Sequence, residues 1–439
     1  MRKNKLGLGA ASPLLLAGAA AILAPACDDT SGTGGNSTTS SSSGNSALEC
    51  PTAPKIDGCT VAIAPSDKDY EHIQTAFGNA HAGDTICLCP GTFNMTREVS
   101  LGVQNVTVRG AGATLADTVL DYAKQDTADD GFAVTAGGFT VENLTLKNTP
   151  GNGIVATGVD GVTFRDLKVF WDAGSVTANG AYAVYPVKSK NVLIEHVEVV
   201  GAADAGVYVG QCEKAIVRNN DVHGCVAGIE SENTTDMEIY DNDAYDNTAG
   251  ILVFVLPGLE KKDGLRTNVH DNKIHDNNRA NFAAKGSVVS YVPAGVGMLV
   301  LAADQPEIHG NTIENNESLG ITVVSGNTLA LLNGKPWSDP MTDLYPTDVF
   351  IHDNTFTNNG TKPHGALMAF TTPVESIVFD GEEMSPGSAK LCLGAMGPYP
   401  TFRNTLGSEN IGNPSMNSTD TTPFQCDGTK LMPVVLDAP

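Results

Sequence analysis

The side chains best suited to chemistry in this chain are carboxylates and tyrosines at matching places in a series of similar segments. Three of these segments, 23 and 22 residues apart, begin at Ala183, Gly206 and Gly228. Each segment alternates apolar residues as a β-strand does. The residue two places after each start is Tyr185, Tyr208 or Glu230, and Glu232 lies on the same side of its strand as Glu230. These residues are therefore expected to be neighbours on an outward strand face.

Glu230 and Glu232 are spaced as a pair of acids on one strand face, with Cα atoms about 6.5–7 Å apart. Paired carboxyl groups with a water between them can serve as general acid and base, although any same-face strand pair has this spacing. Asp204, which lies just before a repeat glycine, flanks the pair. We predict Glu230, Glu232 and Asp204 as the catalytic residues. The alternative is a solvated acidic face with tyrosines packed along it.

Aromatic and polar residues near these acids fit sugar binding, because rings stack on apolar sugar faces while polar groups bind hydroxyls. An inserted loop at 171–181 is expected at the same end of the site. The predicted substrate-binding residues are Trp171, Asn179, Tyr182, Tyr185, Tyr208 and Gln211.

Three histidines, His270, His309 and His352, occupy one position in successive segments and could hold a transition metal. The favoured alternative is ordinary outward residues, because Arg165 and Tyr240 fill the same position elsewhere. The cofactor is unknown from sequence. A divalent cation such as calcium could bind the acidic cluster at 126–130, where a polar turn is the favoured alternative.

The elements that would position these side chains form a repeat. Its phrases begin at Gly131, Gly153, Ala183, Gly206, Gly228, Gly250, Gly297, Gly320 and Gly365. Most gaps are 22 or 23 residues, and the longer ones match a unit plus an inserted loop. Such a period with strand alternation is typical of a β-solenoid. We predict an all-β, right-handed parallel β-helix of about ten coils, closed at its N-terminal end by a short helix at 67–80 with Ser66 or Asp67 as N-cap.

A column of asparagines supports the solenoid. A second strand begins nine residues after each repeat glycine, and the turn that follows it ends at Asn220, Asn242, Asn272, Asn311 and Asn354 in later coils. Asparagines stacked at one turn can hydrogen-bond from coil to coil. The column is therefore predicted to be structural.

The N-terminal segment has the features of an export signal, with a basic start, an apolar run and small residues before Cys27. It resembles a bacterial lipoprotein signal, although Ala24 stands where leucine is usual. We expect lipidation of Cys27 and an outer membrane lipoprotein, periplasmic or at the cell surface. The alternative is ordinary cleavage after Ala26. The predicted organisation is a signal at 1–26, a flexible tether at 27–48, a cap and first coil at 49–100, the β-helix at 101–384 and a tail at 385–439.

Eight cysteines remain after Cys27, an even number that favours disulfides in an exported protein. Cys87 and Cys89 alternate on one strand, so they face the same side. Cys392 with Cys426 is the pair we predict, and the other connectivity does not follow from sequence. The net charge of −24 argues against nucleic acid and anionic lipid surfaces as partners. The expected partner is a carbohydrate or an envelope protein, with membrane contact only through the lipid anchor.

Several long phrases carry a family resemblance. Residues 179–186 (Asn-Gly-Ala-Tyr-Ala-Val-Tyr-Pro), 204–211 and 227–233 resemble a bacterial family of exported parallel β-helix repeat proteins of unknown function, often lipoproteins. More broadly, the chain is similar to the carbohydrate-binding and sugar-hydrolase β-helix repeat of pectate lyases. Mannuronan epimerases carry Asp-Pro-His-Glu after Asn-Gly-Ala-Tyr, with catalytic Asp and His. Here Tyr185-Pro186-Val187-Lys188 stands in that place, which disfavours epimerase chemistry.

Two functions fit the sequence. The first is binding or processing of a carbohydrate on the outer strand face, with polysaccharide lyase or glycoside hydrolase chemistry if the protein is an enzyme. The second is a non-catalytic envelope lipoprotein that offers a rigid surface to a protein partner. An exposed apolar strip through Leu252, Phe254 and Leu299 would favour the second function.

Overall fold

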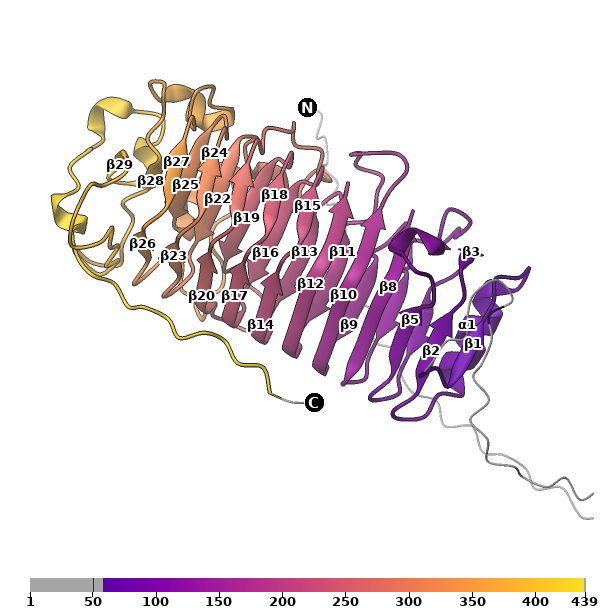
Figure 1. Cartoon of the computed structure of the whole chain (residues 1–439). Coiled ribbons are helices and arrows are strands. Elements are labelled where there is room, and N and C mark those ends of the chain that lie inside the picture. Colours follow the sequence, from indigo (N-terminus) through magenta and orange to yellow (C-terminus); the bar gives the residue numbers. More distant parts are fainter. Residues whose placement is uncertain (1–49, 51–57, 438–439) are drawn as a thin grey trace, which may run out of the picture. The chain divides into compact units, whose positions relative to one another are not determined.

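The computed structural model describes residue 50 and residues 58–437, and these residues form a parallel β-helix. Successive coils stack in chain order, as the colours of Figure 1 show. The predicted signal, Cys27 and tether lie outside the described residues. No helix in the described part of the chain is long and apolar enough to cross a membrane.

The strands form two sheets whose neighbours run parallel. Sheet B contains β4 (Val99–Leu101), β7 (Phe132–Val134), β9 (Ile154–Thr157), β11 (Tyr182–Val187), β13 (Ala205–Gly210), β16 (Ala227–Glu232), β19 (Ala249–Phe254), β22 (Val296–Leu301), β25 (Leu319–Val324), β28 (Ile377–Phe379) and β29 (Phe402–Asn404). The strands of sheet A in the first half are β1 (Val61–Ile63), β2 (Thr85–Leu88), β3 (Gly91–Asn94), β5 (Thr107–Gly110), β6 (Thr118–Asp121), β8 (Phe139–Lys147), β10 (Asp160–Phe170) and β12 (Lys190–Val200). From there on, sheet A has two strands per coil, namely β14 (Glu213–Arg218), β15 (Asp221–His223), β17 (Thr235–Tyr240), β18 (Asp243–Tyr245), β20 (Leu265–His270), β21 (Lys273–His275), β23 (Glu307–His309), β24 (Thr312–Glu314), β26 (Phe350–His352) and β27 (Thr355–Thr357).

The core is a column of aliphatic side chains inside the coils. Register-aligned residues of sheet B, all fully buried, are Val207, Ile229, Ile251, Met298, Ile321 and Ile377. Because a parallel in-register stack places like side chains on top of one another, each coil buries its apolar face against the next. The same register fixes the outward positions, and so it determines which side chains of the candidate site meet.

The predicted asparagine ladder is confirmed. Asn220 donates to Asn242 at 2.8 Å, and the Asn242–Asn272, Asn272–Asn311 and Asn311–Asn354 bonds are each 2.9 Å. The backbone N–H of each donor residue also bonds to the next side chain.

A second ladder was missed from sequence. It joins Asn247, Asn277, Asn316 and Asn359 through side-chain bonds of 3.0–3.1 Å. Its signal was present, because each member lies five residues after a member of the first ladder.

The N-terminal end is closed by α1 (Asp69–Gly78), as predicted, with Ile73 and Phe77 fully buried. The N-cap prediction was wrong. The N-cap residue is Lys68 and no side chain caps it, because the Asp69 carboxylate bonds instead to the backbone N–H groups of Ser66 and Asn94.

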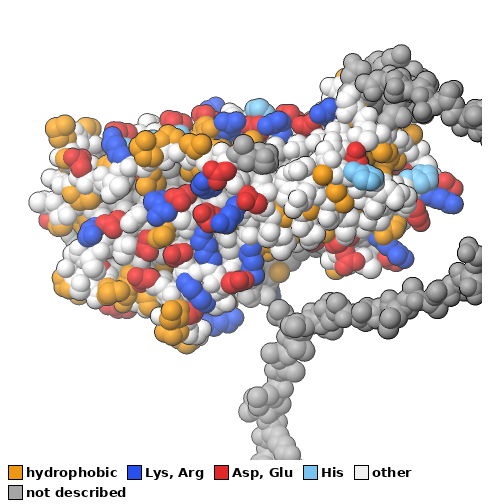
Figure 2. Space-filling model, turned by 90° about the horizontal axis from the view of Figure 1, so that it is seen from below, with side chains coloured by type: hydrophobic (Ala, Val, Ile, Leu, Met, Phe, Trp, Pro, Cys, Tyr) orange, Lys and Arg blue, Asp and Glu red, His pale blue; other side chains and the backbone are white. Residues whose placement is uncertain are grey.

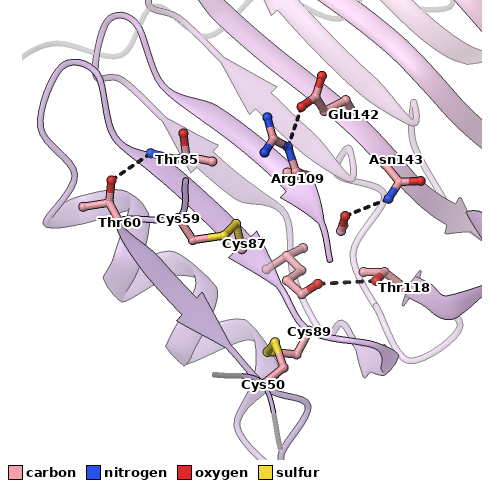
Figure 3. The surroundings of a disulfide bond; sticks show 12 residues. Cys50, Cys59, Thr60, Thr85, Cys87, Cys89, Arg109, Thr118, Glu142 and Asn143 are labelled. Atoms are coloured by element: carbon pink, nitrogen blue, oxygen red, sulfur yellow. Dashed lines mark hydrogen bonds and ion pairs between the residues drawn. A yellow bond between two sulfur atoms is a disulfide. The ribbon is translucent and has the colours of Figure 1, made fainter. Parts of the chain in front are cut away.

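Three disulfides fasten the two ends. Cys50–Cys89 and Cys59–Cys87 hold the segment before α1 against β2 (Figure 3). The predicted Cys392–Cys426 pair is confirmed.

Two of the eight cysteines that follow Cys27 do not form disulfides. Cys212 and Cys225 are free thiols buried inside the coils, although the even number of cysteines favoured pairing of all eight. Burial raises the pKa of each of these two thiols to about 12. Disulfides are typical of exported proteins, and we regard this chain as one.

The last coils depart from the predicted repeat. Gly365 has a φ of +58° and begins the 3-10 helix η3 (Gly365–Ala369), so the last repeat phrase is not a strand. Its place in sheet B is taken by β28, and β29 adds one further strand inside the predicted tail. Two other inserted loops carry η2 (Val288–Tyr291) and the helix α2 (Gly326–Asn333).

The chain after Cys426 returns along the coils (yellow, Figure 1). Backbone N–H groups of Leu431, Val434 and Asp437 donate to Glu307, Glu238 and Asn191 respectively, on strands of sheet A. On the face that Figure 2 shows, basic and acidic side chains lie intermixed.

Candidate functional site

The predicted tyrosines and acids are brought together on β11, β13 and β16. Val184 lies opposite Val207, so Tyr185 and Tyr208 follow them on adjacent strands. Tyr208 lies opposite Glu230, and Gly210 lies opposite Glu232. Tyr182 begins β11, and Asp204 immediately precedes β13. We call Tyr182, Tyr185, Asp204, Tyr208, Glu230 and Glu232 the acid–tyrosine cluster.

The three tyrosine rings of the cluster contact one another. The ring centroids of Tyr182 lie 4.7 Å from those of Tyr185 and Tyr208, and Tyr185 and Tyr208 lie 4.8 Å apart, edge to face. Tyr182 and Tyr185 are half-buried, whereas Tyr208 is buried and its hydroxyl donates a hydrogen bond to Glu232. Tyr182 and Tyr185 therefore present an aromatic surface beside the acids, with the buried Tyr208 ring packed against both.

The acids are buried rather than solvated, so the alternative of a solvated acidic face is wrong. Glu230 is 1% exposed and Glu232 is 8% exposed, while Asp204 is half-buried. The next strand, β19, places the buried side chains of Leu252 and Phe254 opposite Glu230 and Glu232. The acids thus lie between tyrosines on one side and an apolar strand on the other.

Two carboxylate oxygens of the cluster have no hydrogen-bond partner among the described residues, namely Glu230 Oε1 and Asp204 Oδ1. No arginine or lysine in the described part of the chain forms an ion pair with Asp204, Glu230 or Glu232. Buried charge without a partner is strongly unfavourable, and such groups hold protons instead.

The pKa values follow from this environment. Burial raises the pKa of Asp204 to about 7, with the charge of Glu232 adding to the effect and a hydrogen bond from Tyr182 opposing it. Burial also raises the pKa of Glu232 to about 7, against the hydrogen bond from Tyr208. The pKa of Glu230 is raised well above its ordinary value by burial and by both neighbouring acids. At neutral pH the cluster therefore carries protons that ordinary carboxyl groups have lost.

Three predicted substrate-binding residues have structural contacts instead. Trp171 is buried and its Nε1–H donates to the Thr149 carbonyl at 2.7 Å. Asn179 is buried and its amide donates to the carbonyls of residues 174 and 201 at 2.5 and 2.6 Å. The Gln211 side-chain oxygen accepts two backbone N–H bonds from residues 260 and 261. These side chains hold loops in place through the hydrogen bonds described, and we withdraw them as ligands for a sugar.

The inserted loops flank the cluster's face. Loops 171–181 and 277–294 meet where Thr177 donates to the Phe282 carbonyl at 2.7 Å. Loop 256–266 is tied to the ends of β13 and β16 through Gln211 and Asn233, whose amide donates to Leu256 and Lys261 carbonyls. Insertions thus gather around sheet B, as is common where a solenoid has a binding face.

The histidine column has a geometry that does not suit a metal. The His270–His309 and His309–His352 rings are stacked 5.0 and 5.1 Å apart and within 6° of parallel. Their lone pairs therefore do not converge, and the nitrogens of His270 bond to Glu238 and Asp271. Among the described residues no group of three or more His, Cys, Asp or Glu is arranged to hold a metal ion. The column is part of the sheet A surface.

An apolar recess, which sequence reasoning missed, lies on sheet B nearer the C-terminus. Its cavity volume is about 310 Å³, and its floor contains Leu299, Thr322 and Val378 on β22, β25 and β28. The recess is covered by η2 and α2, which come from two inserted loops, and by η3, which stands where the last repeat strand was predicted. The segments that cover the recess do not follow the repeat, so the sequence pattern did not predict that they would meet over sheet B.

Known proteins agree with this architecture. The family model of the right-handed β-helix region matches residues 130–277 and 176–381, together more than half of the chain, and the chain belongs to this family. No curated protein matches the sequence.

Solved structures with this fold are distant. The mannuronan C-5 epimerase AlgE4 A-module of Azotobacter vinelandii is 17% identical, with a TM-score of 0.50 over 72% of this chain and 88% of that one. An alginate lyase of Paenibacillus sp. str. FPU-7 is 13% identical, with a TM-score of 0.43 over 70% of this chain and 99% of that one. The Streptococcus pneumoniae surface adhesin PfbA is 10% identical, with a TM-score of 0.47 over 66% of this chain and 76% of that one. At such identity the likeness shows the fold alone.

Proposed function

We propose that this exported protein binds a polysaccharide at the acid–tyrosine cluster and hydrolyses a glycosidic bond there. The observation that carries the proposal is a pair of carboxyl groups, Asp204 and Glu232, whose pKa values burial raises to about 7, beside two half-buried tyrosine rings. Glycoside hydrolysis needs an acid that still holds its proton at working pH, together with a second carboxylate. The similar fold of a mannuronan C-5 epimerase module is consistent with a carbohydrate ligand.

In this proposal each acid has a distinct role. Asp204 is the half-buried acid and donates its proton to the leaving oxygen. Glu232, hydrogen-bonded by the Tyr208 hydroxyl, accepts a proton from the attacking water. Glu230 is fully buried and has no step of its own; burial and the charges of Asp204 and Glu232 raise its pKa, so it stays protonated beside them. The sugar stacks on Tyr182 and Tyr185.

Hydrolysis fits these residues better than lyase chemistry. A lyase must neutralise a uronate carboxylate before it removes the neighbouring proton. The cluster offers no paired lysine or arginine in the described residues and adds carboxyl groups of its own. Epimerase chemistry also lacks its proton shuttle, because Val187 stands where the epimerase phrase has histidine.

The experiment is a glycan array with the mature domain, residues 49–439, followed by product analysis on the bound glycans. We expect binding that is lost in the Glu230→Gln/Glu232→Gln double variant and cleavage that Asp204→Asn reduces by at least about a hundredfold. Glu314→Gln on β24 of sheet A is the matched control and should leave both unchanged. Absence of binding to every glycan would refute the proposal, and binding without cleavage would limit it to recognition.

The alternative of a docking surface for a protein has lost its distinguishing feature. Of the expected apolar strip, Leu252 and Phe254 are 1% and 4% exposed, whereas Leu299 is half-buried and lines the apolar recess, so the three residues do not form a continuous exposed strip. Lipid anchoring through Cys27 remains part of the proposal. It is tested by metabolic labelling with an alkynyl fatty acid, which Cys27→Ser should abolish.

A further inference from the structure

We infer that the acid–tyrosine cluster selects a cationic sugar, a hexosamine unit with a free ammonium group, rather than a uronate. This inference rests on the proposed function and adds the substrate class. It stands on two independent features of the cluster, namely its unpaired buried carboxylate oxygens and its three tyrosine rings.

The first feature is a pair of buried carboxyl oxygens that accept no hydrogen bond from any described residue. Glu230 is 1% exposed, and its Oε1 has no hydrogen-bond partner among the described residues. Asp204 Oδ1, on the neighbouring coil, also has none. Buried polar atoms are normally paired, and unpaired ones mark a strained or ligand-binding place. A ligand that pairs with these oxygens must donate hydrogen bonds, and a charged donor would also lower the raised pKa values of the cluster's acids and bind them in their ionised form.

The second feature is the aromatic surface. The centroids of the Tyr182, Tyr185 and Tyr208 rings lie 4.7–4.8 Å from one another, directly beside the acids on the same and the next strand. Tyrosine faces attract organic cations within about 6 Å of the ring centroid. An ammonium group carries three N–H donors and no acceptor. It therefore fits both the unpaired oxygens and the rings.

Other ligands fit less well. A metal ion lacks a suitable set of three or more ligating side chains among residues 58–437. A uronate carboxylate would bring only acceptor atoms to oxygens that lack a donor, and no described lysine or arginine forms an ion pair with these acids. Lys188, which follows β11, is already bonded to Glu260 at 2.6 Å. The chain as a whole has a net charge of −24, which repels polyanions further.

The test compares three oligosaccharides of equal length by calorimetry with the mature domain at neutral pH. They are a β-1,4-glucosamine oligomer, its fully N-acetylated form and an oligogalacturonate. N-acetylation removes the charge while the sugar ring remains. We expect the glucosamine oligomer to bind at least about tenfold more tightly than the acetylated form, and the oligogalacturonate not to bind.

Variants assign the preference to the cluster. Glu230→Gln should reduce the preference for the charged oligomer to within about twofold. Asp204→Asn, at a half-buried position, serves the same purpose if Glu230→Gln does not fold. Glu314→Gln should retain the full preference.

Each outcome is decisive. Equal or tighter binding of the acetylated oligomer or the oligogalacturonate overturns the cationic preference and leaves the proposed glycan site standing. A preference that survives both cluster variants overturns the assignment to these carboxylates. If no glycan binds, here or on the array, both the inference and the proposed function fail.

Discussion

Replacing Glu232 by glutamine should make the protein less sensitive to alkaline pH. The folded-state pKa of Glu232 is raised from 4.5 to about 7 by burial. The folded protein thus retains a proton that the unfolded chain releases, and the free energy of unfolding falls as pH rises through this window. Below pH 4.5, Glu232 is protonated in both the folded and the unfolded state and does not change the free energy of unfolding. Above about pH 7 it is ionised in both states, and the full cost of its buried charge lowers the free energy of unfolding. At 1.36 kcal/mol per pKa unit, the penalty is about 3 kcal/mol.

Glutamine has the shape of a protonated glutamate, and its oxygen can still accept the Tyr208 hydrogen bond. Glu232→Gln should therefore match the wild type near pH 4 and be more stable by about 3 kcal/mol near pH 8. Groups outside the cluster that titrate in this window, such as His270, are common to both proteins and cancel in the difference. Asp204 does not cancel, because the charge of Glu232 raises its pKa; losing that charge stabilises the variant further at alkaline pH, in the same direction.

Urea unfolding followed by fluorescence, at several pH values with disulfides intact, measures the effect. Only the difference between variant and wild type is interpreted, with Glu314→Gln as the control that should follow the wild type. A difference that does not grow between acid and alkaline pH would refute the idea that Glu232 is protonated because it is buried. A difference that grows in the opposite direction would mean that Glu232 is ionised and stabilised by a partner.

Two further predictions concern the solenoid. Asn272→Ala should destabilise the protein by about 3–5 kcal/mol in urea unfolding, because the buried Asn272 side chain accepts two bonds from Asn242 and donates both to Asn311 and to backbone carbonyls. Asn354→Ala should cost clearly less, because Asn354 is half-buried and has no further asparagine of the ladder among the described residues to donate to, and equal losses would contradict the cooperative ladder. Cys392→Ser should free the returning tail at a cost of about 3–4 kcal/mol for its 34-residue separation. Limited proteolysis should then cut after residue 426 first, and unchanged protection would show that the hydrogen bonds to sheet A suffice.

The repeat phrase and the asparagine column predicted the fold because a parallel solenoid repeats its constraints in every coil. A glycine at each strand start, alternating aliphatic residues and an asparagine at each turn are local signals that recur with one period. The same register brought Tyr208 and Glu230 together as predicted. Where the period ended, prediction failed, as at Gly365, because nothing local distinguishes a further coil from a 3-10 turn.

The sequence by itself determined which side chains are neighbours, because the register of a parallel stack follows from the repeat length. Only the tertiary structure decided their environment. Glu230 and Glu232 are buried between β13, with Tyr208, and the apolar strand β19, and that burial raises their pKa values so that they retain protons. The tertiary structure also buries Trp171 and Asn179, which were predicted to bind sugar, and their side chains hydrogen-bond to backbone carbonyls of loops instead. Burial depends on contacts between residues far apart in the chain, and no local pattern records those contacts.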